Sequence, residues 1–202
     1  MRGNRIWGTS NYTSPLRLSS SQSLPSQLEA YGKWIEEMVV EGWDAYYTNF
    51  MFRHISGSPA KRFAIMRNEV ERIYSTIVSR VERKPTSPKR QRYLPRFIGC
   101  EDRQVPKFNK ALSRLVAVND GAHLNGVFLF PLTSRLRKHP IDLIGDNEKY
   151  YIREGGPLYR IHLTPLHVTI HKAVDYTFKS IKRGWVREDD IIILPKSLGE
   201  VA

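Results

Sequence analysis

The feature that most constrains the fold is a long amphipathic segment that follows directly on a strand-like one. After Ser58-Pro59, a typical helix start, apolar residues recur every three or four positions as far as Lys84-Pro85. These residues are Phe63, Met66, Val70, Ile73, Ile77 and Val81. The preceding residues 44–52 are rich in aromatic side chains, which favour strands. The rest of the chain must therefore fold around a strand joined to a long helix.

The remaining segments add strands and two more helices to this framework. Helical spacing predicts helices over 28–40 and 171–183, the second of them ended by Gly184. Strand-like runs cover 94–99, 122–130, 159–163 and 191–194, and a polar, basic loop covers 85–93. This order predicts an α+β fold, a ferredoxin-like antiparallel sheet with helices on one face.

The N-terminal residues differ in composition from the rest. Residues 1–27 are rich in Ser, Thr, Asn and Pro, and such a segment buries too little apolar surface to offset its ordering entropy. We therefore expect a flexible tail over 1–27 and a single α+β domain over 28–202.

The charge balance is strongly basic. The 32 Lys and Arg against 20 Asp and Glu give a formal charge of +12, which attracts polyanions such as nucleic acids. Residues 80–110 alone hold ten Lys and Arg against three Asp and Glu, which favours a phosphate-binding segment over evenly spread, solubilising charge. The expected phosphate contacts are Lys89, Arg90, Arg92 and Arg96, with Lys172, Lys182 and Arg183 on the later helix.

Cys100 is the single cysteine, which excludes an intramolecular disulfide and suits a reducing compartment. It lies in an apolar run, where a buried, inert thiol is expected. No run of apolar residues is long enough to span a bilayer, and the N-terminus lacks the apolar stretch of a secretory signal. We therefore expect a cytoplasmic protein without a membrane partner.

The strand over 122–130 carries the first candidate for chemistry. Alternate residues of a strand share a face, so His123 and Asn125 point the same way. An imidazole nitrogen and an amide oxygen are ligands for ions such as Mg²⁺ or Mn²⁺. The alternative is a structural histidine on a strand.

The helix over 171–183 carries the second candidate for chemistry. Lys172, Tyr176, Lys179 and Arg183 fall on the side opposite its apolar stripe. Cations near a tyrosine favour its phenolate form and stabilise the charge that develops on a phosphate in transfer. The alternative is a solvated basic helix face with one exposed tyrosine.

The strand over 46–52 is the third candidate for chemistry. Tyr46, Thr48, Phe50 and Phe52 share one face, and Tyr47, Asn49 and Met51 share the other. Aromatic side chains beside basic ones can stack on the bases of single-stranded nucleic acids. For most of these residues, burial in the core is the expected role.

In order along the chain, these motifs resemble those of HUH endonucleases, a class that includes rolling-circle replication initiators, relaxases and some transposases. The first motif is similar to Tyr47-Thr48-Asn49-Phe50, the second to His123-Leu124-Asn125, and the third, in single-tyrosine form, to Tyr176-Thr177-Phe178-Lys179. The resemblance covers residues 44–183, roughly, and it departs from the family at Asn125, where the family has its second histidine.

The resemblance implies a metal-dependent enzyme that nicks and joins single-stranded DNA in replication initiation or mobilisation. Tyr176 would be the nucleophile, assisted by the charge of Lys179. Mg²⁺ or Mn²⁺ would be held by His123 and Asn125, with His162 as the first candidate for a third ligand. The departure at Asn125 lowers the expected metal affinity.

Two other functions compete with this one. The chain would be a non-catalytic binder of single-stranded nucleic acid if the metal site has been lost from the same scaffold. It would be a protein-interaction module if its basic face serves a protein partner. No helicase-type phosphate loop occurs in the sequence, so we expect any unwinding to come from a helicase or from other replication or mobilisation proteins.

Overall fold

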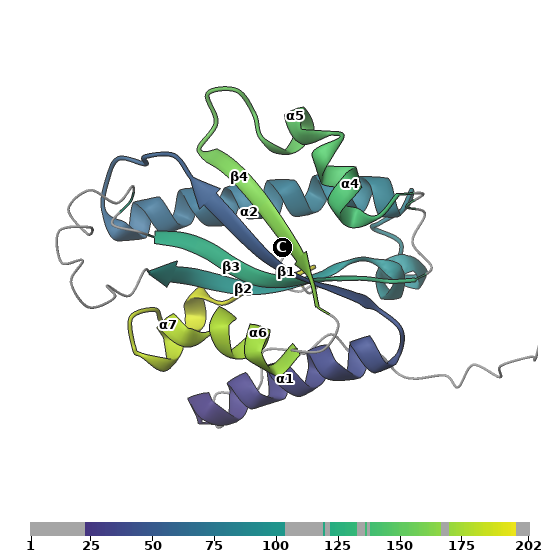
Figure 1. The fold of residues 1–202 in the computed structure, drawn as a ribbon, viewed down its shortest axis with the longest axis horizontal. Coiled ribbons are helices and arrows are strands. Elements are labelled where there is room, and N and C mark those ends of the chain that lie inside the picture. The colour runs from purple at the N-terminus through teal and green to yellow at the C-terminus, as the bar shows by residue number, and fades with distance from the viewer. Residues whose placement is uncertain are drawn as a thin grey trace, which may run out of the picture.

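The structure, a computed structural model, describes residues 23–103, 119, 122–132, 136, 138–166 and 170–196. Within these residues the chain forms a five-stranded sheet in the order β4-β1-β3-β2-β5, with antiparallel neighbours throughout (Figure 1). The strands are β1 (Asp44–Phe52), β2 (Arg96–Arg103), β3 (Ala122–Phe130), β4 (Leu158–Pro165) and β5 (Ile192–Leu194).

Helices occupy most of the described chain between these strands. The two longest are α1 (Leu24–Val40) and α2 (Pro59–Val81). The shorter α-helices are α4 (Pro140–Gly145), α5 (Glu148–Tyr151), α6 (Ile170–Thr177) and α7 (Lys179–Lys182). Two 3₁₀ helices are η1 (Pro88–Tyr93) and η3 (Glu188–Asp190).

The first four strands have the predicted ferredoxin-like arrangement. Helix α2 connects β1 to β2, α4 and α5 connect β3 to β4, and the strand order β4-β1-β3-β2 places each connected pair on either side of a third strand. These connecting helices cover one face of the sheet, where Met66 and Ile73 of α2 and Tyr151 of α5 pack with Phe50 and Phe128. The α+β fold with an antiparallel sheet is therefore confirmed.

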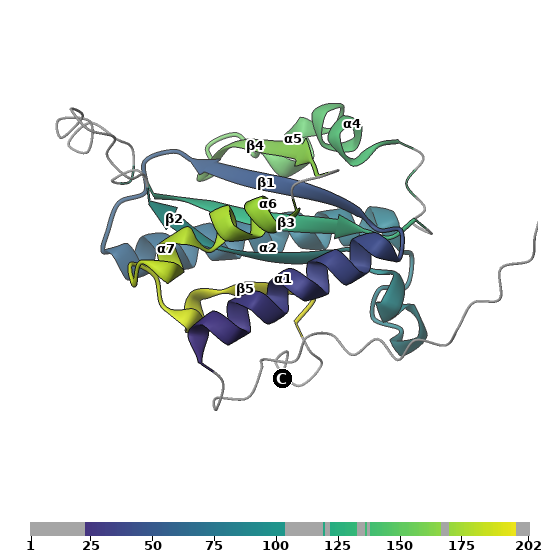
Figure 2. The ribbon, with the colours of Figure 1, turned by 60° about the horizontal axis from the view of Figure 1, so that its bottom comes forward.

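The expectation that helices cover one face is correct only for the connecting helices. Helices α1, α6 and α7 cover the opposite face (Figure 2). The physical reason is visible in β3, where Val127 and Phe128 are both apolar and point to opposite faces. A strand that is apolar on both sides must be covered on both sides. Leu28 and Ile35 of α1 supply part of the second cover.

Helix α2 forms where its pattern predicts. The Ser58 side chain accepts a hydrogen bond from the Lys61 amide, and Pro59 occupies the first turn. Helix α1 begins at Leu24, so residues 24–27 of the predicted tail are helical, and residues 1–22 lie outside the described residues. Leu28, which follows, is buried, and packing of this apolar face stabilises the first turn.

The predicted helix over 171–183 is broken into α6 and α7 at Phe178. The Thr177 hydroxyl donates to the carbonyl of Ala173 at 2.8 Å, an interaction that bends helices. The Thr177 carbonyl accepts from the thiol of Cys100 at 3.1 Å, and this contact ties the break to β2. Gly184, at φ +69°, ends the second piece as expected.

Other element bounds agree with or refine the expectations. The predicted strands over 44–52 and 122–130 match β1 and β3. The short helices α4 and α5 were not predicted, and part of the expected loop over 85–93 is the 3₁₀ helix η1. Among the helices that the structure describes, none has the length and apolar composition needed to cross a membrane.

Candidate active site

The sheet register brings four polar side chains from β1, β2 and β3 to one face. Asn49 of β1 lies opposite Asn125 of β3, and Asp102 of β2 lies opposite His123 of β3. Directly opposed residues of an antiparallel pair point to the same face. His123 and Asn125 therefore share a face, as the sequence predicts, and α6 and α7 lie on that face.

Asp102 is the centre of this cluster. Its side chain is fully buried, and its Oδ2 lies 2.7 Å from Lys179 Nζ, 2.9 Å from Asn125 Nδ2 and 3.2 Å from His123 Nε2. The Oδ1 atom accepts from the Ser180 hydroxyl at 2.6 Å and from the Arg103 amide at 2.9 Å. The carboxylate thus ties β2 to β3 and to the short helix that follows the break at Phe178.

The charges of the cluster are fixed by these contacts. Burial by itself raises the pKa of Asp102, but hydrogen bonds from His123, Lys179 and Ser180 outweigh it and hold the pKa below its ordinary value. Burial by itself lowers the pKa of Lys179, but hydrogen bonding to Asp102 raises it above its ordinary value. A carboxylate and an ammonium therefore face each other with little contact to water.

The orientation of the Asn125 amide follows from the charge of Asp102. A carboxylate only accepts hydrogen bonds, so the nitrogen of the Asn125 side chain faces it. The Asn125 oxygen is turned to Asn49, whose Nδ2 donates to it at 2.7 Å. In this arrangement the Asn125 oxygen does not face Asp102 or His123, contrary to its expected role as a metal ligand.

Within the part of the chain that the structure describes, two buried polar atoms beside this amide pair, Asn49 Oδ1 and the Tyr47 hydroxyl, have no hydrogen-bond partner at bonding distance. Burial is the main reason that the pKa of Tyr47 is raised well above its ordinary value, and the nearby Tyr176 and Asp102 raise it further. The Tyr47 hydroxyl therefore stays protonated. Unpaired buried polar atoms are costly and are usually satisfied by water or a ligand. The side chains of Tyr47 and Asn49 nevertheless interact with each other within the buried cluster.

Tyr176 lies at the open side of the cluster and is half-exposed, at 49%. The Lys179 ammonium lies 3.7 Å from the centre of its ring, and the Tyr47 ring meets it edge to face at 5.8 Å. Lys179 therefore contacts both Tyr176 and Asp102. The structure thus links Tyr176 through Lys179 to Asp102, which also contacts His123 and Asn125.

One pair of atoms in this cluster has the spacing of two neighbouring metal ligands. Asp102 Oδ2 and His123 Nε2 lie 3.2 Å apart, close to the spacing of about 3 Å for two neighbouring ligands of an octahedral ion bound at about 2.1 Å. Mg²⁺ and Mn²⁺ keep several waters, so two protein ligands can hold them. Among the described residues, no three His, Cys, Asp or Glu side chains are grouped to hold a metal.

His162 does not join Asp102 and His123 as a third candidate metal ligand. It lies on β4 opposite Asn49, with β1 between it and β3, and it is exposed. Its Nδ1 lies 3.5 Å from the Thr164 hydroxyl. Asp102 takes the place that the sequence assigned to His162, because β2 and not β4 is the strand next to His123. The signal that the sequence offered was the acidic pair Glu101-Asp102, which directly follows the apolar run 97–100.

The predicted phosphate contacts on η1 lie at the other end of β2 from Asp102. Lys89, Arg90 and Arg92 are exposed on η1, which precedes the start of β2, whereas Asp102 lies near its end. Six residues of strand separate Arg96 from Asp102, about 20 Å at 3.4 Å a residue. The predicted phosphate contacts on η1 therefore do not adjoin Asp102.

Three of the predicted phosphate contacts are engaged within the protein. Arg96 is buried, and its guanidinium donates to the Gln91 carbonyl at 3.2 Å, so it is not on the surface. Lys182 forms an ion pair with Asp175, and Arg183 lies over the Trp185 ring. Lys172 is exposed on α6, one turn before Tyr176.

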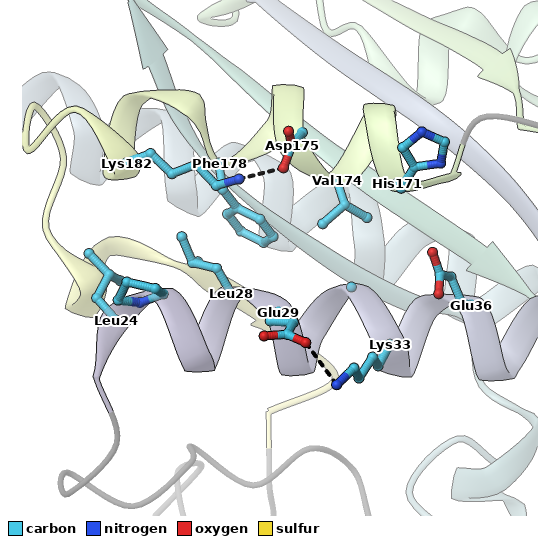
Figure 3. Close-up of a pocket in the computed structure, with 12 residues that line it drawn as sticks. Leu24, Leu28, Glu29, Lys33, Glu36, His171, Val174, Asp175, Phe178 and Lys182 are labelled. Carbon is cyan, nitrogen blue, oxygen red and sulfur yellow. Dashed lines mark hydrogen bonds and ion pairs between the residues drawn. The ribbon is translucent and has the colours of Figure 1, made fainter.

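A groove of about 590 Å³ lies between α1 and the α6–α7 pair (Figure 3), and Asp102 is not among the residues that line it. Leu28, Val174 and Phe178 contribute its apolar lining. Its two lysines are paired with carboxylates, Lys33 with Glu29 and Lys182 with Asp175. The groove therefore does not present unpaired positive charge to a phosphate.

Comparison with known proteins gives no match to a family model, to a curated protein sequence or to a solved structure.

Proposed function

We propose that this chain binds single-stranded DNA and nicks and rejoins it through Tyr176. The observation that carries the proposal is that Lys179 contacts both the Tyr176 ring and the carboxylate to which His123 and Asn125 are bonded. A structural histidine and an isolated surface tyrosine would not require these residues to meet. A half-exposed tyrosine beside a cation and a candidate metal site is the arrangement that phosphoryl transfer needs.

In the proposed reaction, the phenolic oxygen of Tyr176 forms a bond to phosphorus and the bond from phosphorus to the 3′ oxygen breaks. The phenolic proton passes to water, and the departing oxygen takes a proton from water. The product is a 5′-phosphotyrosine with a free 3′ hydroxyl, and the reverse reaction joins the strand. Lys179 lies where its charge stabilises the phosphate in transit.

Mg²⁺ or Mn²⁺ would be held by Asp102 and His123, and would polarise the scissile phosphate. The proposal includes a cytoplasmic location and a partner helicase or other replication or mobilisation protein that exposes the single strand.

The test is incubation of the protein with labelled single-stranded oligonucleotides and Mn²⁺, followed by denaturing gel electrophoresis. We expect cleavage and a covalent protein–DNA adduct, both lost on addition of a chelator. The Tyr176→Phe variant should form no adduct. Tyr150→Phe is the matched control, because Tyr150 is 48% exposed and also lies beside cations, Arg80 and Lys149, but on α5. An adduct that persists in Tyr176→Phe would refute the nucleophile.

A second function is favoured by the saturation of Asp102. Five donors surround its two oxygens, and the Asn125 nitrogen is one of them. A site so fully bonded suits a non-catalytic protein that binds single-stranded nucleic acid on the same scaffold. Salt-sensitive oligonucleotide binding without any adduct would establish this function in place of the first.

A further inference from the structure

The sheet face that carries the candidate site is not fully covered by the helices that the structure describes. Helix α6 packs against β2 and β3, and α7 packs against β2. Neither these helices nor α1 crosses β4 in Figure 2. On β1, Tyr47 packs against this helix layer, and Asn49 and Met51 point to the same face because they follow it at alternate positions. An open surface over β1 and β4 therefore begins beside Tyr176, whose ring meets the Tyr47 ring at 5.8 Å.

Strand β4 contributes three side chains to this surface, because directly opposed residues of antiparallel strands share a face. The opposed pairs are Thr164 with Tyr47, His162 with Asn49, and Arg160 with Met51. The three β4 residues are exposed, and Met51 is 40% exposed. We call the surface formed by Met51, Arg160, His162 and Thr164 the β1–β4 face. From Thr164 to Arg160 it extends about 14 Å, at about 3.4 Å a residue, which is the length of about four stacked nucleotides.

The side chains of the β1–β4 face suit the bases of a single strand. The thioether of Met51, the imidazole of His162 and the guanidinium plane of Arg160 can each pack against the flat face of a base. In a duplex the bases stack on one another and their faces are covered, so this kind of contact selects unpaired nucleotides.

The charge of the β1–β4 face is available to a phosphate. Within the part of the chain that the structure describes, Arg160 has no ion-pair partner. Lys182 and Arg183, by contrast, are engaged by Asp175 and by the Trp185 ring. An unpaired guanidinium on an exposed strand binds a phosphate without first breaking an ion pair.

We propose that single-stranded nucleic acid lies along the β1–β4 face as it approaches Tyr176, with bases against Met51 and His162 and a phosphate on Arg160. The proposal rests on the binding part of the proposed function and involves no metal ion. It gives His162 a role in place of the metal ligation that the sequence predicted. It also directs the strand over β4 and β1, across the sheet from β2 and from the basic residues of η1.

The test measures binding of a fluorescein-labelled, 12-nucleotide oligo(dT) to the full chain by fluorescence anisotropy, with EDTA present throughout. Replacing Met51, Arg160 and His162 together with Ala should weaken binding at least about 25-fold, because two stacking contacts are lost at about fivefold or more each. The slope of log affinity against log salt should fall by about 0.7, for the one phosphate contact of Arg160. The same oligonucleotide paired with oligo(dA) should bind the native chain and the triple variant with affinities that differ less than threefold.

The matched control is a second triple variant in which Ile141, His171 and Arg187 are replaced with Ala. These residues are also exposed, Ile141 at 37%, but they lie on α4, at the groove and ahead of η3. The control should bind oligo(dT) as the native chain does. All six positions are exposed, and thermal unfolding verifies that both variants fold.

Three results would overturn the proposal: unchanged oligo(dT) binding in the first triple variant, an equal loss in the control, or an equal loss for the duplex. A first triple variant that binds and is nicked as the native chain is would overturn this inference and leave the proposed function intact. Binding that is lost in this variant, in a native chain that never forms an adduct with Mn²⁺, would refute the nicking reaction and leave the inference intact.

A second measurement uses the native chain. Met51 is exposed, whereas Met38 and Met66 are buried, so hydrogen peroxide should convert Met51 to its sulfoxide well before them. Peptide mass spectrometry follows this reaction with and without saturating oligo(dT). We expect the bound strand to slow the oxidation of Met51 several-fold and the duplex to slow it less. An unchanged rate at saturation would refute the contact.

Discussion

At the scale of single residues, Asn125 controls how many ligands the candidate site can offer. Its nitrogen faces Asp102 and its oxygen faces Asn49, so it acts as a bridge between two strands. An imidazole at this position would add a neutral nitrogen ligand beside Asp102 and His123. It would also remove one donor from the crowded carboxylate.

The Asn125→His variant should therefore bind Mn²⁺ more tightly than the native chain, by about tenfold, the scale on which changes around a metal site act. Calorimetry measures the affinity, and thermal unfolding verifies that the larger ring is accommodated at this buried position. His162→Asn serves as the control and should leave Mn²⁺ binding unchanged, because His162 lies beyond β1. Loss of binding in His162→Asn would restore it as a ligand.

Part of the site follows from local sequence, and part does not. The spacing of His123 and Asn125 on a strand and of Tyr176 and Lys179 on a helix was sufficient to select all four. Asp102 was missed because its role depends on which strand lies beside β3, and strand order is a tertiary property. The burial of Arg96 was missed for the same reason. The sequence of a basic segment does not show which of its side chains face water and which face the core.

At the scale of elements, the centre of the sheet depends on two glycines at opposed positions, Gly99 of β2 and Gly126 of β3. The Phe97 ring lies against both, and an added Cβ on Gly126 would lie 2.4 Å from that ring and 2.7 Å from the Ile98 carbonyl oxygen. The ring therefore occupies the space that two side chains would otherwise fill. These glycines adjoin Asn125, so their packing supports the site.

The Gly126→Ala variant should lower the free energy of unfolding by about 1–3 kcal/mol, because the methyl group overpacks the core. Urea unfolding followed by circular dichroism measures the change. Gly145→Ala is the matched control, since an added Cβ at the end of α4 meets no atom within 4 Å. Its stability should be unchanged or slightly higher. An equal effect of the two substitutions would contradict the packing argument.

Most long elements could be predicted from hydrophobic period, because α2, β1 and β3 each present a regular apolar pattern over nine or more residues. Helices α4 and α5 have six and four residues, too few for a period to be read. The break at Phe178 was not predictable from spacing. It arises from the Thr177 side chain and from the contact of its carbonyl with Cys100, a residue far away in the sequence.

At the scale of the whole molecule, the net charge of +12 is not gathered at the candidate site. Within the described residues, η1 exposes Lys89, Arg90 and Arg92 ahead of the start of β2, whereas Lys179, which contacts the Tyr176 ring, is paired with Asp102 near the end of β2. A single strand that follows β2 from η1 to Asp102 would span about 20 Å, or about six nucleotides at 3.4 Å each.

Replacing Lys89, Arg90 and Arg92 together with Gln should weaken binding of a 20-nucleotide strand and leave binding of a 4-nucleotide strand unchanged. The slope of log affinity against log salt should fall by about 2 for the long strand, from three lost phosphate contacts at about 0.7 each. Fluorescence anisotropy over a salt series measures both. Replacing Lys33, Lys138 and Arg187, which are paired with carboxylates, removes equal charge as a control. An identical loss in both triple variants would mean that net charge alone acts.

Because Cys100 contacts Thr177, chemical labelling of its thiol can report on the movement of α6. The only thiol in the chain is fully buried beneath the end of the helix that carries Tyr176, and burial raises the pKa of this thiol above its ordinary value. A thiol reagent can reach it only when α6 separates from β2. The rate at which Cys100 is labelled therefore measures how often α6 separates from β2. A bound strand that holds α6 in place should slow this labelling, and no engineered probe is needed to detect it.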